Sequence, residues 1–399
     1  PGTSRLQLYS VCQMLSLVSF LHSQKGIKMK NGAYGFIVTV VCLTMAARAQ
    51  TVSPELAQQA RASVEKGLAW LKTQQKPSGA WSEENMPALT ALPLWAFAAS
   101  GATAYAPVQD KAVAFLLGLQ RPDGGIYVPV PDRKGGGLGN YNTSIIAMAL
   151  QATGRRETVP ALLKARAYIA SSQHVGDDSH AGGFGYDKET KRAYADLNNT
   201  QFSMDAMRRT QSVEDQRPAG EKKADINWDA ALKYVLQMQN TEGETAGGFA
   251  YNTEDPKGGT VTNANGKVML RAYGSMTYAG VLAMVHAQLD KSDPRVRSAV
   301  DFGSRYWTVD ENPGQGQQGV YFYLNVMARA LSAARLDTLP KHDKSGEIRW
   351  REELVKKLIA LQKPDGSWAN ANNRWWENDP VLATSYALLA LEFAGGLTR

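Results

Sequence analysis

The stretch KGLAWLKTQQKPSGAW, residues 66–81, decides the fold of this 399-residue chain. Its helical pattern ends at Gln75. Pro77 and Gly79 then predict a turn, and Trp81 follows this turn. The same order of features recurs along the chain, strongly in some places and weakly in others. The recurrences lie at residues 115–126, 168–184, 234–249, 299–322 and 358–368. Self-similarity of this kind predicts a repeat architecture with six units.

Each unit also contains a second helical segment, rich in small and apolar residues. These segments lie at 88–100, 142–154, 199–209, 274–289, 320–335 and 383–394. Several are apolar on nearly all sides, which predicts helices buried on most faces, whereas the first segments, such as 53–75, are amphipathic. Helices buried on both sides need an outer layer. The sequence therefore predicts an all-α fold, an α/α toroid of six inner and six outer helices, in one domain over 52–396. We expect the recurring glutamine and tryptophan to tie each outer helix to the next inner helix.

The first 49 residues are interpreted separately from this domain. Residues 29–49 begin with MK, continue with a mostly apolar run and end in ARA at Ala49, the pattern of a signal peptide and its cleavage site. An uncleaved membrane anchor is the alternative, but the run is shorter than the roughly 20 residues that span a bilayer. Residues 1–28 are interpreted as a non-native upstream segment. We therefore expect an exported protein, periplasmic or extracellular after cleavage near Ala49.

Charge and cysteine content exclude several functional classes. The leader carries five basic residues and no acidic one, so its removal leaves 39 Lys and Arg against 37 Asp and Glu, and the net charge falls from +7 to +2. This balance does not indicate a nucleic-acid partner, which needs a concentrated basic surface. Cys12 and Cys42 both lie in the leader. The predicted domain therefore has no disulfide, no thiol nucleophile and no Cys-ligated zinc.

The opening stretch resembles the QW repeat of squalene and oxidosqualene cyclases. The residues that carry the resemblance are Lys66, Gly67, Trp70, Gln74, Gln75, Gly79 and Trp81. The segment Gln362–Trp368 is similar to the same element, and protein prenyltransferase β subunits share the likeness. As a whole, the chain resembles exported bacterial prenyltransferase/squalene-oxidase-repeat proteins. The resemblance implies a terpenoid cyclase-like toroid, in one copy, with an isoprenoid in its central cavity.

The catalytic motifs of those families are missing from this sequence. It contains no D-x-D-D acid and no D-D-x-x-D diphosphate site, and the acidic cluster at 176–180 is predicted to be a solvated turn. The zinc site of the prenyltransferases needs Asp, Cys and His, and the domain has no cysteine. The sequence therefore predicts the scaffold without a metal or another cofactor, and the fold alone assigns no reaction.

Three residues are candidates for catalysis. Asp196 precedes the third inner helix, where it either caps the helix or belongs to a site at the cavity mouth. Asp205, within that helix, either faces the lumen or lies on an outward polar stripe with two neighbouring arginines. His286, late in the fourth inner helix, is either a satisfied core histidine or a ligand or base.

Aromatic and polar residues near the predicted helix starts are candidates for ligand binding. Trp375 and Trp376 are adjacent in a loop, where two neighbouring side chains rarely both enter a core. Asp379 before Pro380 also fits an N-cap. Glu311 lies in a Gly-rich loop that lacks the Lys and Ser/Thr of a P-loop. The full set of candidates is Tyr186, Asn199, Tyr251, Tyr278, Glu311, Tyr323, Trp375, Trp376 and Asp379.

Three functions remain open at this point. The first is binding, with or without transformation, of an isoprenoid or another extended apolar molecule, because aromatic faces can stabilise carbocations. The second is a secreted polysaccharide lyase-like enzyme that acts on a glycan. The third is a non-catalytic scaffold associated with the cell envelope. A deep aromatic lumen favours the first, an open groove with acids about 5–10 Å apart favours the second, and a plugged lumen with an exposed apolar patch favours the third.

Overall fold

The computed structural model describes residues 52–132, 135–188, 193–254, 257–262 and 265–397. The chain divides into two units, residues 1–50 and 51–399, and only the second is described below. The predicted signal peptide at 29–49 and the upstream segment 1–28 lie outside the described residues. Within those residues, no helix is both long enough and apolar enough to cross a bilayer.

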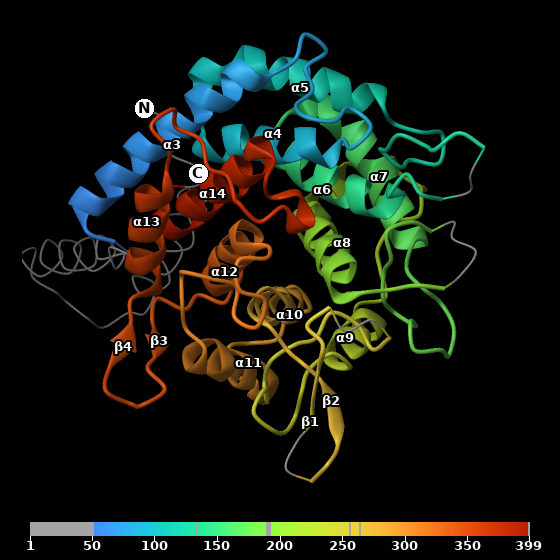
Figure 1. The fold of residues 1–399 in the computed structure, drawn as a ribbon. Coiled ribbons are helices and arrows are strands. Elements are labelled where there is room, and N and C mark those ends of the chain that lie inside the picture. The colour runs from blue at the N-terminus through green and yellow to red at the C-terminus, as the bar shows by residue number, and fades with distance from the viewer. Residues whose placement is uncertain (1–51, 133–134, 189–192, 255–256, 263–264, 398–399) are drawn as a thin grey trace, which may run out of the picture. The chain divides into compact units, whose positions relative to one another are not determined.

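Two concentric layers of helices make up this second unit (Figure 1). Among the described residues, the inner layer consists of α4 (Ala88–Ser100), α6 (Gly139–Ala152), α8 (Leu197–Arg209), α10 (Gly274–His286), α12 (Val320–Ala333) and α14 (Pro380–Gly395). The outer layer consists of α3 (Pro54–Gln74), α5 (Ala106–Gly118), α7 (Val159–Ser171), α9 (Trp228–Leu236), α11 (Pro294–Arg305) and α13 (Trp350–Leu361). Each inner helix packs on the next, and α14 packs on α4, so the ring closes. The predicted α/α toroid is confirmed.

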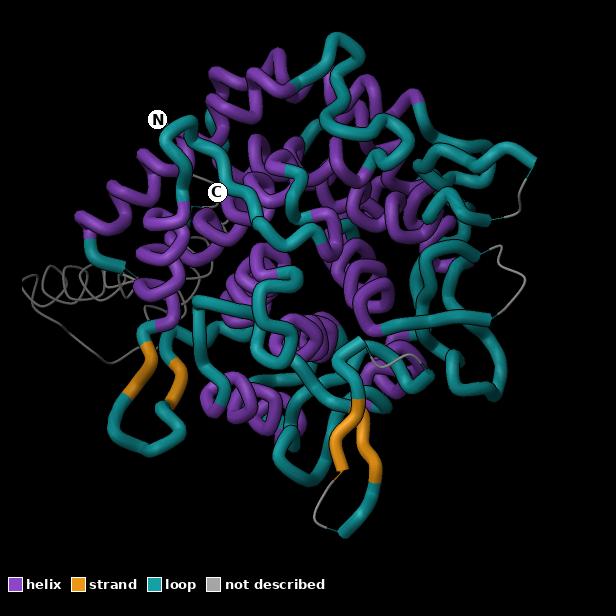
Figure 2. Tube along the Cα trace, in the orientation of Figure 1, coloured by secondary structure: helices purple, strands orange, loops and turns teal. Residues whose placement is uncertain are grey.

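Strands are few in the described chain and lie in two hairpins at its edge (Figure 2). One hairpin pairs β1 (Thr260–Thr262) with β2 (Val268–Leu270), and the other pairs β3 (Leu339–Pro340) with β4 (Glu347–Ile348). Both are antiparallel. Loops and helices make up the rest, as the near absence of period-2 patterning predicts.

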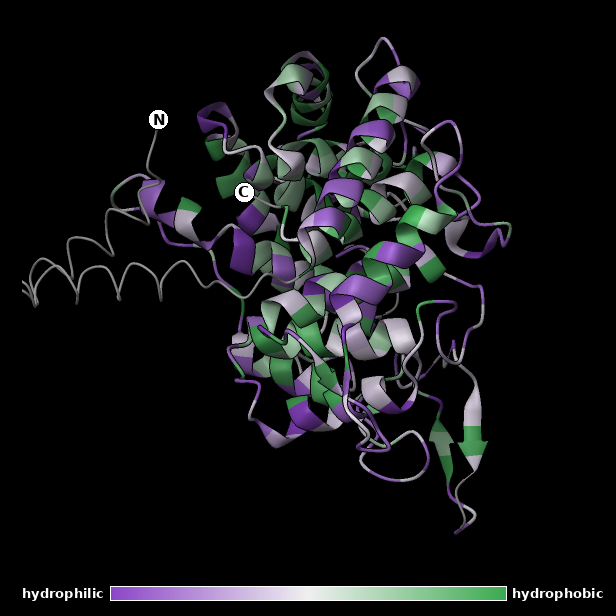
Figure 3. Cartoon of the chain, turned by 90° about the vertical axis from the view of Figure 1, so that its left-hand side faces the viewer, coloured by the Kyte–Doolittle hydropathy of each residue, from purple (hydrophilic) through white to green (hydrophobic). Residues whose placement is uncertain are grey.

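The two layers differ in which residues they bury. In α14 nearly every side chain is buried, because one face contacts the lumen and the other contacts the outer helices. In α3 the buried residues recur every three to four positions, at Leu56, Ala60, Val64, Leu68 and Leu71. Helices on the face turned toward the viewer in Figure 3 accordingly alternate hydrophilic and hydrophobic residues. One-sided burial therefore places the amphipathic helices outside.

The recurring glutamine links neighbouring outer helices. The side-chain Nε2 of Gln75 donates to the carbonyl oxygen of Gly79 at 3.0 Å and to that of Val108, in α5, at 2.9 Å. Gly79 has a φ of +92°, and a Cβ there would collide with the carbonyl of Lys111. The other four glutamines, Gln120, Gln173, Gln239 and Gln362, bond in the same way to their own turn and to the next outer helix. The prediction that the glutamine reaches the following inner helix is therefore wrong.

The tryptophan of the opening stretch does link an outer helix to an inner one. The indole Nε1 of Trp81 donates to the carbonyl of Leu71 in α3 at 2.7 Å, and its backbone N–H donates to Thr90 Oγ1 in α4 at 3.1 Å.

In the unit that lacks the glutamine, the Nε1 of Trp307, which follows α11, donates to Glu353 of the next outer helix, α13, at 2.6 Å. A tryptophan in this unit therefore links two consecutive outer helices, as the glutamine does in the other units.

Candidate ligand cavity

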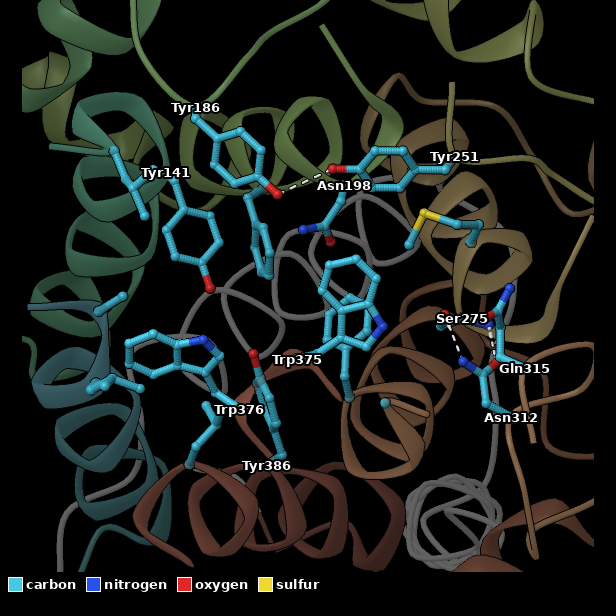
Figure 4. Close-up of a pocket in the computed structure, with 18 of the residues that line it drawn as sticks. Tyr141, Tyr186, Asn198, Tyr251, Ser275, Asn312, Gln315, Trp375, Trp376 and Tyr386 are labelled. Atoms are coloured by element: carbon cyan, nitrogen blue, oxygen red, sulfur yellow. Dashed lines mark hydrogen bonds between the residues drawn. The ribbon is translucent and has the colours of Figure 1, made fainter. Parts of the chain in front are cut away.

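The first turns of the inner helices surround a cavity (Figure 4). The space between its lining atoms, with the open solvent at its mouth included, is about 1070 Å³. Aromatic side chains make up much of the wall. They are Tyr141, Tyr186, Phe202, Tyr251, Tyr273, Phe322, Trp375, Trp376 and Tyr386. Its remaining apolar lining includes Met86, Leu89, Leu138, Met276 and Leu382. None of the described lining residues is acidic or basic.

A layer of aromatic rings connects the inner helices at cavity depth. The ring centroid of Phe202 lies 5.7 Å from that of Tyr141 and 6.2 Å from that of Phe322. Phe322 in turn lies 5.8 Å from Tyr386. Burial raises the pKa of Tyr141 and Tyr386, so both phenols stay neutral at ordinary pH. These rings present a wall that suits an apolar or a positively polarised ligand.

An ion cluster fills the lumen one turn beyond this layer. Asp205 is fully buried and accepts hydrogen bonds from Arg209 Nε at 2.7 Å and from Arg329 of α12. His286 Nε2 lies 2.8 Å from the Asp205 carboxylate, and Trp95 lies under both guanidinium groups at 5.2 and 4.9 Å. Burial, together with the positive charges of Arg209 and Arg208, lowers the pKa of His286 to about 3. Asp205 therefore points into the ring rather than onto the outward stripe, and His286 is a core histidine.

Asp196 both caps α8 and belongs to a buried polar network. Its Oδ1 accepts from the backbone N–H of Asn199 at 2.8 Å, and its Oδ2 accepts from the Asn199 side chain at 2.7 Å. Burial raises the pKa of Asp196, although hydrogen bonds from Asn199, Tyr251 and Tyr194 act against this shift. The Tyr251 hydroxyl lies 3.1 Å from that of Tyr186, and both tyrosines line the cavity. Asp196 therefore reaches the cavity through tyrosines rather than directly.

The two adjacent tryptophans stand at the open side of the cavity on a strained loop. Trp375 and Trp376 have φ values of 61° and 65° and are 40% and 51% exposed. Left-handed backbone at two successive bulky residues costs of order 1–3 kcal/mol each, and strain of this kind concentrates at ligand clamps. The next residue, Glu377, holds the loop in place because its carboxylate accepts the backbone N–H groups of Tyr321 and Phe322 at 3.2 and 2.7 Å.

The structure separates the predicted ligand-binding residues into two groups. Tyr186, Tyr251, Trp375 and Trp376 line the cavity. Asn199, Tyr278, Glu311, Tyr323 and Asp379 lie outside this wall. The catalytic candidates Asp196, Asp205 and His286 also lie outside the cavity wall.

Each of the five exceptions has a structural reason. Asn199 is engaged by Asp196, as described above. The rings of Tyr278 and Tyr323 lie 5.9 Å apart, and the Tyr323 hydroxyl donates to the carbonyl of Thr308, in a loop outside the cavity wall. Asp379 caps α14 by accepting from Val381 N at 2.8 Å. Glu311 is exposed.

Sequence reasoning missed several lining residues, among them Phe322, Tyr386, Met276 and Gln315. Each lies in the first two turns of an inner helix or in the loop that precedes one. That position is the signal that could have identified them, because the ligand side of a toroid is formed by equivalent turns of all its inner helices.

Comparison with known proteins supports the fold. No protein-family model and no curated protein sequence matches the chain. Among solved structures, the type II terpene cyclase MstE from Scytonema is similar over 86% of this chain and 99% of its own, with a TM-score of 0.52 and 14% identity. The GH76A alpha-1,6-mannanase from Salegentibacter sp. HEL1_6 is similar over 85% of this chain and 100% of its own, with a TM-score of 0.56 and 11% identity. The chain thus has the α/α toroid fold that these proteins share.

Proposed function

We propose that the toroid binds an isoprenoid, or another extended apolar molecule, in the cavity between the first turns of its inner helices. The observation that carries this proposal is the wall itself, which combines many aromatic side chains with no described charged residue. Burial of apolar ligand surface contributes about 25 cal/mol per Å², so such a wall favours long hydrocarbon chains over hydrated molecules. The same proposal includes a location outside the cytoplasm, which the leader predicted at 29–49 supports.

Structural neighbours are consistent with this ligand class. MstE has been solved in complex with geranylgeranyl dihydroxybenzoate, its substrate, and with merosterolic acid A, its product. The mannanase has been solved with alpha-1,6-mannotriose, so the shared fold alone also accommodates a glycan ligand. Glycosidases use a pair of carboxylates beside the scissile bond. The described cavity wall contains none, and Asp177 and Asp178 are exposed in a loop. The wall therefore favours the isoprenoid.

A chemical step is a finer part of the proposal. Asp196 is a buried acid that is connected to the cavity wall by hydrogen bonds, and its raised pKa favours the protonated form. Tyr251 and Tyr186 link it to the wall. This arrangement suits transfer of a proton from Asp196, through the tyrosines, to a bound alkene. The carbocation that forms when the alkene accepts the proton would face aromatic rings.

Binding can be tested with a variant that fills the cavity and a matched surface variant. Leu382→Trp places a large ring in the cavity wall, whereas Val175→Trp adds the same ring at a position that is 96% exposed and outside the wall. Native mass spectrometry with added geranylgeraniol should show a bound ligand for the wild type and for Val175→Trp, and at least tenfold less for Leu382→Trp. Equal binding by all three proteins, or by none, would refute the proposal.

A further inference from the structure

One amide in the cavity wall has no hydrogen-bond partner in the described structure. Asn198 lies in the first turn of α8, and its side chain points into the cavity (Figure 4). Its Oδ1 is enclosed by the protein and has no partner, and no described hydrogen bond reaches its Nδ2. The neighbouring Asn199, in contrast, donates from its backbone N–H and from its side-chain Nδ2 to Asp196. The position of Asn198 is therefore not explained by capping of the helix.

The other side-chain amides of the described cavity wall, and two of its tyrosines, have partners within the protein. Asn312 donates to Ser275 Oγ at 3.1 Å and accepts from the Ser275 backbone at 2.9 Å. Gln315 donates to the carbonyl oxygen of Lys257 at 3.1 Å. Tyr186 and Tyr251 are paired through their hydroxyls. Asn198 is thus the amide of the described wall that is left to interact with a ligand.

An enclosed amide without a partner is costly, which restricts what the cavity should hold. The cost is about 1–3 kcal/mol for a buried donor or acceptor, and native proteins rarely leave such groups unpaired. Water can hydrogen-bond the part of this half-buried side chain that faces the cavity, but a hydrocarbon that displaces this water cannot replace its hydrogen bonds. A ligand that replaces them must carry a polar group at this depth of the cavity.

The amide selects among polar groups by their donor and acceptor capacity. A hydroxyl donates and accepts, so it matches Asn198 whichever way the amide is turned. A ketone, ether or ester only accepts. An ammonium, carboxylate or phosphate would lose its hydration with no oppositely charged group in the described wall, which costs far more than a hydrogen bond returns. A neutral hydroxyl is the group that fits.

We propose that Asn198 recognises a hydroxyl group of the ligand, so that the cavity selects an isoprenoid alcohol over the hydrocarbon of the same length. This inference rests on the proposed function and adds the chemical class of the ligand to it. The hydroxyl lies against the first turn of α8, near the aromatic layer. The hydrocarbon chain lies against Met86, Leu89, Leu138 and Leu382, on the side of the cavity formed by α4, α6 and α14.

The test compares two ligands in two proteins. The ligands are geranylgeraniol and the same chain with hydrogen in place of the hydroxyl, and the proteins are the wild type and Asn198→Leu, which keeps the side-chain size. Dissociation constants are measured by native mass spectrometry and by quenching of the tryptophans at the mouth. The wild type should bind the alcohol about tenfold more tightly, which corresponds to about 1.4 kcal/mol. Asn198→Leu should bind both ligands with equal affinity.

The possible outcomes separate this inference from the proposed function. Equal binding of the alcohol and the hydrocarbon by the wild type would overturn the inference and leave the proposed function intact. A preference that survives in Asn198→Leu would overturn it as well, because another group would then hold the hydroxyl. Binding of neither ligand by the wild type would refute both. If Asn198→Leu does not fold, Asn198→Ala carries the same expectation of a lost preference.

Discussion

Removal of the Asp205 carboxylate should destabilise the toroid strongly, because it leaves a buried arginine without its partner. Asp205 and Arg329 are fully buried, and the two residues come from α8 and α12, which are not neighbours in the inner ring. Breaking a buried pair by removing one partner typically costs 3–5 kcal/mol. We therefore expect Asp205→Ala to lower the free energy of unfolding by about that amount.

The corresponding change in melting temperature follows from the size of the domain. Unfolding entropy is about 2.1 cal/mol/K per residue, so a domain of ~350 residues has about 0.7 kcal/mol/K. A loss of 3–5 kcal/mol then lowers the melting temperature by about 4–7 °C. Differential scanning calorimetry measures this shift directly.

A double variant distinguishes an unpaired charge from a loss of packing. Asp205→Ala with Arg329→Met removes both charged groups and keeps most of the volume, so we expect it to recover most of the lost stability. Arg209→Ala, which removes a partner whose side chain is 29% exposed, should cost less. If Asp205→Ala melts like the wild type, or if the double variant melts no higher than Asp205→Ala, the structural role assigned to Asp205 is wrong.

Two further predictions concern stability. Gln75→Ala should cost about 1–3 kcal/mol in urea unfolding, since it removes the two hydrogen bonds that tie the turn and α5 to α3. Gln74→Ala, at an exposed neighbouring position, should cost less than about 0.5 kcal/mol, and equal effects would contradict the linking role of Gln75. Burial raises the pKa of Glu392 well above its ordinary value of 4.5. Its contribution to stability is thus present below pH 4.5 and is lost, by about 1.4 kcal/mol per pH unit, as the pH rises toward the folded-state pKa. Glu392→Leu should therefore raise the melting temperature increasingly from pH 5 upward, and a constant difference across pH would argue against this.

The layers of the fold could be predicted from the sequence because burial leaves a local signature. The segment predicted at 88–100 is helix α4, Ala88–Ser100. Amphipathic and uniformly apolar helices alternate along the chain, and a double ring buries both kinds. The cap at Asp379 could also be recognised, since Asp followed by Pro is a local signal.

The cavity wall could not be predicted in the same way. A helix that is apolar all round does not show which face points to the lumen. The sequence therefore suggests Tyr278 and Tyr323 for the cavity, although they lie outside its wall, and does not single out Tyr386, which lines it. The partner of Gln75 cannot be predicted for a related reason, because Val108 lies 33 positions away. Contacts between helices depend on how the ring closes, and no short stretch of sequence contains that information.

Ring closure also bears on where the chain begins and ends. Gln362 and Ser63 are 299 positions apart, yet they exchange two hydrogen bonds of 2.8 and 2.9 Å, and α13 packs on α3 as a neighbour. This junction has the same form as those between consecutive units. An open array of repeats needs special capping units at its ends, whereas this ring has no end to protect. Its connectivity could thus be opened at another loop, and the old termini joined, without changing which helices touch. A unit could not be added or lost as freely, because the circle would have to reopen.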